Sequence, residues 1–183
     1  SFSVSAFQVY HRGPDCFGYL FEEKPRRPFL EREAEQLNIP PGPLRGKLVA
    51  GQVIQLPDGR LIEPDQVLGP ARPGTRMIHV GDSGRTDNLL DVCHQADLLV
   101  IEATYLNKEF EMARDFAHLT ARQAAELARD AEIKNLILTH ISRRYRERDV
   151  LSEAQEIFPQ TNVARDFDFF QVKRDKCQKV EKI

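Results

Sequence analysis

The chain has 183 residues, of which 41% are hydrophobic and 30% are charged, and its formal net charge is −2. These values are typical of one folded globular domain and exclude a disordered, fibrous or membrane-embedded chain. Because the 26 basic and 28 acidic residues nearly cancel, any binding of nucleic acid would have to rest on local clusters of basic side chains.

The cysteines and the ends of the chain bear on where the protein works. Cys16, Cys93 and Cys177 are odd in number and have no C-x-x-C spacing, which argues against a disulfide framework and a cysteine zinc site. No apolar run reaches the roughly 18 residues of a membrane span, and the first residues alternate like a strand instead of resembling an export signal. We expect a reduced, cytoplasmic protein with no membrane contact. Because this sequence begins in a strand pattern and without Met, we also expect it to be the continuation of a longer chain.

The first elements in chain order are two strands. Residues 2–11 and 17–22 predict a hairpin around a turn that holds Gly13 and Pro14. Residues 24–74 differ in composition from the rest of the chain, because most of the 11 prolines fall here. The pattern predicts a short helix at 30–37 and a hairpin at 53–62 within this segment. We expect this segment to be an inserted, flexible arm outside the core. It carries the basic tracts KPRRP and PLRGK, which hold Lys24, Arg26, Arg27, Arg45 and Lys47.

From residue 75 onward, short apolar strands alternate with amphipathic helices. The pattern predicts strands at 76–80, 98–103 and 135–140, with helices at 88–96, 108–114, 120–131 and 149–157. Thr120 and Gln123 form a capping box that begins the third helix. Residues 163–172 predict a last strand, for which an edge position is one option, and residues 173–183 predict a frayed, charged tail. This alternation favours an α/β fold in which helices cover a sheet.

Three of the predicted strands lead into side chains that can bind a metal ion. His11, Asp82 and His140 each follow an apolar run, and α/β proteins place their chemistry where such strands end. Two imidazoles and a carboxylate suit zinc or manganese, and the carboxylate could bridge two ions. Each residue also has a structural alternative: hydrogen bonding for the histidines and helix or turn capping for Asp82. His79 and His94 are assigned structural roles.

Two further groups could take part in chemistry. His118 precedes the helix at 120, and Glu102 ends an apolar strand, so the carboxylate could accept the N–H of the imidazole. Without that pairing, both are surface or strand-end polar residues. The basic cluster SRRYRER at 142–148 directly follows His140, and it is either a solvated face or a binding site for phosphate.

These residues resemble ribonuclease Z (tRNase Z), a family of the metallo-β-lactamase superfamily whose members trim the 3′ end of precursor tRNA. The resemblance runs from the first strand to about Val172, in the order of the family's motifs: HRGPDCFGYLFEE, PPGPL, GDSGRTDN, IEATY, HLTARQAA and LTHISRRY. It implies an αββα sandwich, of which this chain is the C-terminal half. Residues 1–23 and 75–172 would form that half, and residues 24–74 the inserted tRNA-binding arm.

The resemblance also implies a role for each matching residue. His11 and His140 would be ligands to two different zinc ions, with Asp82 as the bridging carboxylate, and manganese or magnesium would be alternatives. His118 would protonate the leaving 3′ oxygen, next to Glu102. The residues that would contact RNA are Pro41, Gly42, Pro43, Arg45 and Lys47 in the arm and Arg143 and Arg144 after His140. The resemblance further implies a zinc-dependent endoribonuclease that leaves a 3′ hydroxyl, and a homodimer.

One motif of the family is missing from this chain. The N-terminal His-x-His-x-Asp-His motif, which supplies most of the metal ligands, is absent. We therefore expect the chain to need a separate N-terminal half to complete the metal site. Two alternatives stay open: a phosphodiesterase of the same superfamily that does not act on tRNA, and an inactive fragment that binds tRNA or dimerises.

Overall fold

The computed structural model describes residues 2–173 and 176–181, and they divide into two compact units. One unit is residues 24–74, which we call the arm. The other, which we call the body, joins the segment before residue 24 to the segment after residue 74. No helix in the described part of the chain is long and apolar enough to cross a membrane.

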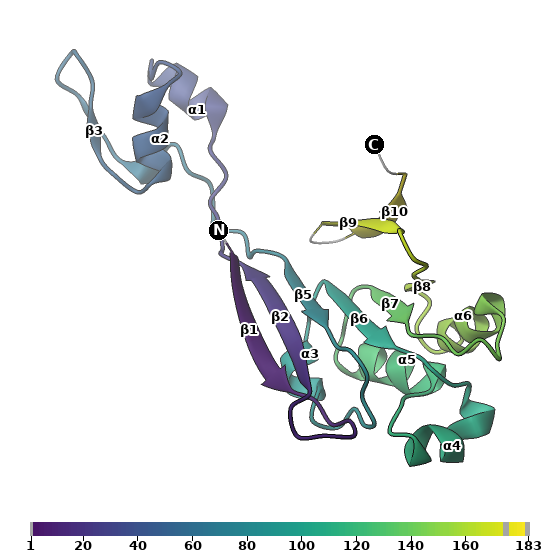
Figure 1. Cartoon of the computed structure of the whole chain (residues 1–183). Coiled ribbons are helices and arrows are strands. Elements are labelled where there is room, and N and C mark those ends of the chain that lie inside the picture. Colours follow the sequence, from purple (N-terminus) through teal and green to yellow (C-terminus); the bar gives the residue numbers. More distant parts are fainter. Residues whose placement is uncertain (1, 174–175, 182–183) are drawn as a thin grey trace. The chain divides into compact units, whose positions relative to one another are not determined.

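The body is built on a six-stranded sheet in the order β1-β2-β5-β6-β7-β8 (Figure 1). Its strands are β1 Phe2–Gln8, β2 Phe17–Glu23, β5 Arg76–His79, β6 Leu98–Glu102, β7 Leu136–Thr139 and β8 Thr161–Val163. The strands β1, β2 and β5 pair antiparallel. The strands β5, β6, β7 and β8 pair parallel, so β5 has one antiparallel and one parallel neighbour. This mixed sheet and the helices on it agree with the predicted metallo-β-lactamase fold class.

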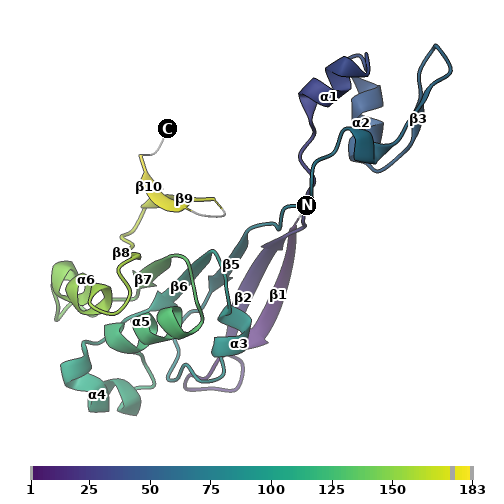
Figure 2. The ribbon, with the colours of Figure 1, turned by 180° about the vertical axis from the view of Figure 1, so that it is seen from behind.

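The helices of the body are α3 Leu90–Cys93, α4 Phe110–Asp115, α5 Ala121–Asp130 and α6 Glu147–Gln155, with a 3₁₀ turn at Asn107–Glu109. Figure 2 shows α3 and α5 in front of the sheet, on the face that is turned away in Figure 1. The predicted capping box begins α5: the Thr120 hydroxyl accepts from the Gln123 N–H, and the Thr120 N–H donates to the Gln123 side chain. This helix buries its alanine-rich face and Leu127 against the sheet.

The two faces of the sheet differ because alternate residues of each strand point to opposite sides. Ile78, Leu99 and Leu138 belong to the buried core that the helices cover. The opposite face includes Val4, which is 51% exposed, and Tyr19, which is 42% exposed. Apolar side chains are therefore left in solvent on that face of the body.

The arm has a core of its own, which the sequence analysis did not predict. It contains α1 Glu31–Gln36, α2 Pro43–Val49, the short hairpin β3 Ile54–Gln55 with β4 Leu61–Ile62, and a 3₁₀ turn at Pro64–Gln66. The buried side chains of this core are those of Ala34, Ile39, Leu48, Ile54, Leu56, Ile62 and Val67. The segment is therefore a small folded unit and not an extended excursion, because its few apolar residues meet at one centre.

Several predicted boundaries are wrong. The single last strand predicted at 163–172 is two strands, β8 in the six-stranded sheet and β9 outside it, because residues 165–168 form a turn in which the Asp168 N–H donates to the Arg165 carbonyl. The first strand ends at Gln8 and not at His11, because the chain bends at residues 11–14; the Val9 N–H still donates to the Cys16 carbonyl just before that bend. The residues after Val172 were expected to fray, but Lys176–Val180 form β10, which pairs antiparallel with β9 Phe169–Lys173. Residues 174, 175, 182 and 183 of the predicted tail lie outside the described part of the chain.

Candidate metal centre

The topology brings four strand ends to one edge of the sheet. β1 is antiparallel to β2, which is antiparallel to β5, so β1 runs in the same direction as the parallel strands β5, β6 and β7. Their carboxyl ends therefore meet at the same edge. His11 follows β1, Asp82 follows β5, Glu102 ends β6 and His140 follows β7. The sequence analysis placed these residues at strand ends, and the sheet order places them together.

Asp82 faces two of the predicted ligands with its two carboxylate oxygens. Its Oδ2 lies 3.9 Å from His11 Nε2, and its Oδ1 lies 3.6 Å from His140 Nε2. Two atoms bound to one tetrahedral zinc at ordinary bond lengths lie about 3.4 Å apart. Each pair thus fits the first coordination sphere of one ion with a shift of a few tenths of an ångström. The donor set, neutral imidazole and carboxylate, also suits zinc or manganese.

His118 lies at the same place. Candidate ligand atoms of His11, Asp82 and His118 are all within 4.8 Å of one another. The ring centroid of His118 is 5.0 Å from that of His11 and 5.2 Å from that of His140. This imidazole therefore lies next to both of the other histidines.

Glu102 holds His118 in place. Its Oε1 lies 2.8 Å from His118 Nδ1, as the sequence analysis considered, and the carboxyl side chain is fully buried. The same carboxylate also accepts from the backbone N–H of Ser83 at 2.7 Å and of Leu119 at 3.2 Å. The Thr104 hydroxyl lies 2.5 Å from its Oε2. One buried carboxylate thus ties the loop after β5 to the loop that precedes α5.

Local backbone contacts fix the remaining loops. The Ala117 carbonyl lies 2.8 Å from His11 Nδ1, which directs Nε2 of that ring toward Asp82. A Cβ at Gly84 would lie 3.0 Å from Ala117, so the two loops touch closely and a side chain at residue 84 would force one of them to shift by a few tenths of an ångström. His140 has a φ of 53°, a conformation that is costly for a residue with a side chain, and its carbonyl lies 3.0 Å from the Thr104 hydroxyl.

Two arginines stack on aromatic rings beside His11, and the sequence analysis missed both pairs. The guanidinium of Arg85 lies 4.5 Å from the ring centroid of Tyr10, and that of Arg12 lies 5.6 Å from the ring centroid of Phe116. Both stacks join loops that are distant in sequence, so no local pattern marks them. The only available signal is that Tyr10 and Arg12 flank a predicted ligand.

The two arginines after β7 have different surroundings. Arg143 and Arg144 are exposed and lie in the turn that follows His140. Arg144 lies 3.8 Å from the Glu109 carboxylate and also donates to the Met112 sulfur, whereas Arg143 has no ion pair among the described residues. Arg143 is thus the more available of the two for an anionic ligand.

The predicted RNA-contacting residues of the arm lie around the start of α2. Gly42 has a φ of 125° and caps this helix, and Pro43 is its first residue. Arg45 donates to the Ile39 carbonyl from two of its nitrogens and lies over the Phe29 ring, so it stabilises the arm itself. Pro41 and Lys47 are exposed, and Lys47 has no ion pair within the part of the chain that the structure describes.

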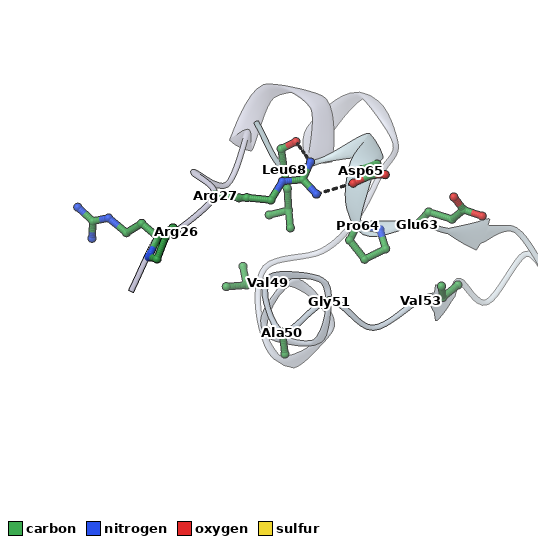
Figure 3. A pocket seen from close by; sticks show the side chains of 11 residues that line it. Arg26, Arg27, Val49, Ala50, Gly51, Val53, Glu63, Pro64, Asp65 and Leu68 are labelled. Carbon is green, nitrogen blue, oxygen red and sulfur yellow. Dashed lines mark hydrogen bonds and ion pairs between the residues drawn. The ribbon is translucent and has the colours of Figure 1, made fainter. Parts of the chain in front are cut away.

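The arm also contains an open cavity of about 580 Å³ (Figure 3). Arg26 and Arg27 contribute to its lining, and Arg27 is paired with Asp65 and with the Leu68 carbonyl. Val49 and Val53, which are 56% and 54% exposed, complete an apolar part of the rim. This cavity was not predicted from the sequence, because it is lined both by the end of α2 and by the turn at Pro64–Gln66, which are distant in the chain.

The residues assigned structural roles lie away from the cluster. His79 is exposed in β5 opposite Tyr19, and His94 caps the end of α3, where its carbonyl accepts from Arg76. Among the described residues, neither of these two histidines belongs to the group that could hold an ion.

Cys93, the last residue of α3, is fully buried, and burial raises the pKa of its thiol to about 12.

Comparison with known proteins adds independent information. Residues 66–141 match the model of the β-lactamase superfamily domain. The chain is 43% identical over 167 residues to a ribonuclease Z of Bradyrhizobium diazoefficiens. The matched segment covers 91% of this chain and 56% of that protein. The chain thus spans about half the length of the curated relatives that it matches.

Solved structures support the same fold. The metallo-β-lactamase fold protein YhfI of Bacillus subtilis aligns with a TM-score of 0.57 at 15% identity, over 90% of this chain and 47% of that one. The short form of human tRNase Z aligns with a TM-score of 0.50 at 23% identity, over 91% of this chain and 41% of that one. At these identities the structural matches establish the fold alone.

Proposed function

We propose that this chain, which belongs to the ribonuclease Z family of the β-lactamase superfamily, is part of an endoribonuclease that cuts precursor tRNA at its 3′ end. The observation that carries the proposal is the position of Asp82, whose two oxygens face His11 and His140 separately. Such an arrangement suits a carboxylate that bridges two divalent ions, and paired ions are common in enzymes that hydrolyse phosphodiesters.

The number of ligands supports the need for a further segment. His11, Asp82 and His140 would give each of two zinc ions only two protein ligands, whereas catalytic zinc sites have three. Apolar side chains of β1 and β2 are also exposed on the uncovered face of the sheet, among them Phe2 and Val4. A second sheet packed on that face would bury them and could supply the missing ligands. We assign this role to a region equivalent to the N-terminal part of the relatives.

Each residue of the cluster would have a distinct task. A bound divalent ion would supply Lewis-acid activation of water and of the phosphodiester. His11 Nδ1 is held at the Ala117 carbonyl, which fixes the ring with Nε2 free to bind. His118 is held by Glu102 through Nδ1, so its Nε2 would donate a proton to the leaving 3′ oxygen. Hydrolysis would leave a 3′ hydroxyl on the tRNA.

The RNA would be held by basic and backbone contacts outside the cluster. Arg143 and Lys47 are exposed and unpaired among the described residues, so phosphates can reach them. The segment Pro41–Gly42–Pro43 is exposed at the start of α2, where the arm would contact a distant part of the tRNA. We further propose that the complete enzyme is a cytoplasmic homodimer that uses zinc, with manganese or magnesium as possible substitutes.

The test is to measure zinc content and cleavage of precursor tRNA with the 183-residue chain, alone and with an added N-terminal region from a relative. We expect cleavage with a 3′ hydroxyl product only when that region is present, and loss of cleavage in an Asp82→Asn variant. Binding of tRNA without cleavage in every combination would contradict the proposal and favour an inactive tRNA-binding fragment. Equal cleavage of unrelated phosphodiesters would favour a different hydrolase of the superfamily.

A further inference from the structure

The side chains of Arg12 and Phe116 form an exposed platform next to His11. Arg12 Nε donates to the Phe116 carbonyl at 3.3 Å, and the guanidinium lies over the aromatic ring. Phe116 is 46% exposed, although a large apolar ring gains from burial. The backbone of Phe116 is itself fixed, since its N–H donates to the Met112 carbonyl at the end of α4. A rigid, exposed ring beside a cation is an arrangement that a flat, anionic ligand can use.

The charge of Arg12 is not neutralised by a neighbouring carboxylate. No ion pair of Arg12 occurs within the described residues, and Asp115, which precedes Phe116, lies 3.7 Å from Arg114 instead. Arg85, the other stacked arginine, differs in this respect because two of its nitrogens contact both oxygens of Asp87. The charge of Arg85 is therefore already neutralised within its own loop, whereas most donors of Arg12 remain free for a ligand.

The position of the platform relates it to the proposed reaction. Arg12 directly follows His11, and Phe116 lies two residues before His118. The Ala117 carbonyl between Phe116 and His118 accepts from the His11 ring, so the platform and the two histidines share one hydrogen-bonded unit. A polymer held with its phosphate at the histidines would extend over these side chains.

The chemistry of the platform selects the ligand. A free phosphate would use the guanidinium but not the ring, and an apolar ligand would use the ring but not the charge. Nucleotides of single-stranded RNA use both, because bases stack on aromatic rings and phosphates pair with arginine. We propose that Arg12 and Phe116 form a subsite for an unpaired nucleotide of RNA, with the base on the ring and the adjoining phosphate on the guanidinium. This inference rests on the proposed function in taking RNA as the substrate.

The test is the binding of a fluorescent single-stranded oligoadenylate to the 183-residue chain, followed by anisotropy at several salt concentrations with EDTA present. We expect Phe116→Leu to raise the Kd by about fivefold to a hundredfold, the range of one base–aromatic stack. Phe116→Tyr should restore the affinity, because it keeps an aromatic face. Arg12→Gln should reduce the slope of log K against log salt by about 0.7, the value for one phosphate contact on a single strand.

A matched control separates the subsite from the overall charge. Arg129→Gln also removes one exposed arginine, but Arg129 is paired with Asp130 near the end of α5, so we expect an unchanged slope. Equal slopes for the Arg12 and Arg129 variants, an unchanged Kd for Phe116→Leu, or no oligoadenylate binding by the parent chain would overturn the subsite. Thermal midpoints equal to that of the parent chain verify folding. Binding that depends on Arg12 and Phe116, together with no tRNA cleavage even when the N-terminal region is added, would sustain the subsite and contradict the proposed function.

Discussion

Glu102 offers the most direct test of how the candidate site is held together. Its buried carboxylate accepts from the backbone N–H groups of Ser83 and Leu119, and it also contacts the Thr104 hydroxyl and the His118 ring. Replacing it by alanine leaves three buried backbone donors without a partner, because the Thr104 N–H also donates to this carboxylate. Because each such donor costs about 1–3 kcal/mol, Glu102→Ala should lower the free energy of unfolding by about 3–9 kcal/mol, with a further cost for the cavity.

The Glu102→Gln variant should be milder for a geometric reason. An amide oxygen in the place of Oε1 can still accept from Ser83 and His118. The amide nitrogen in the place of Oε2 can donate to the Thr104 hydroxyl, which can in turn donate to the His140 carbonyl 3.0 Å away. The N–H groups of Leu119 and Thr104, which both bond to Oε2, would then face another donor and lose their partner. The expected loss is therefore about 2–6 kcal/mol.

Urea unfolding of both variants and the parent chain, followed by circular dichroism, measures this difference. Glu126→Gln is a suitable control, because Glu126 accepts from Arg122 on the exposed side of α5 and such pairs contribute little. If the alanine and glutamine variants lose the same stability, or if neither differs from the control, the carboxylate does not satisfy the buried donors and the reasoning fails.

Three other changes test separate parts of the structure. Leu48→Ala removes a fully buried side chain from the core of the arm and should destabilise the arm by about 2–5 kcal/mol, so hydrogen exchange should rise within residues 24–74 and not in the body. Equal increases in both units would refute the separate core. Thr120→Ala removes the N-cap of α5 and should cost about 1 kcal/mol in urea unfolding; a neutral result would show that the cap is dispensable. The raised pKa of Cys93 means that the folded chain keeps a proton that the unfolded chain loses above its ordinary pKa of 9.0, so stability should fall as pH rises from there toward about 12. Cys93→Ala should flatten that pH dependence of the urea midpoint, and an unchanged slope would contradict the assignment.

Much of the body could be predicted from the sequence because its signals are local. Short apolar runs between amphipathic stretches indicate strands and helices, and the capping box at Thr120 marks the beginning of α5. The runs also showed that His11, Asp82 and His140 follow strands. The same local signals failed at the edges: β1 ends before His11, and the charged C-terminal segment pairs as a hairpin. Pairing depends on a partner strand, which local composition does not reveal.

The amino-acid sequence alone established the kinds of elements and the residues able to carry chemistry. Tertiary structure decided which of those residues meet, because the order and direction of the strands bring the ends of β1, β5, β6 and β7 to one edge. The split contacts of Asp82 and the stack of Arg12 on Phe116 join segments up to about a hundred residues apart. Contacts over such separations depend on the packing of the whole sheet and its helices, and no short pattern in the chain can encode them.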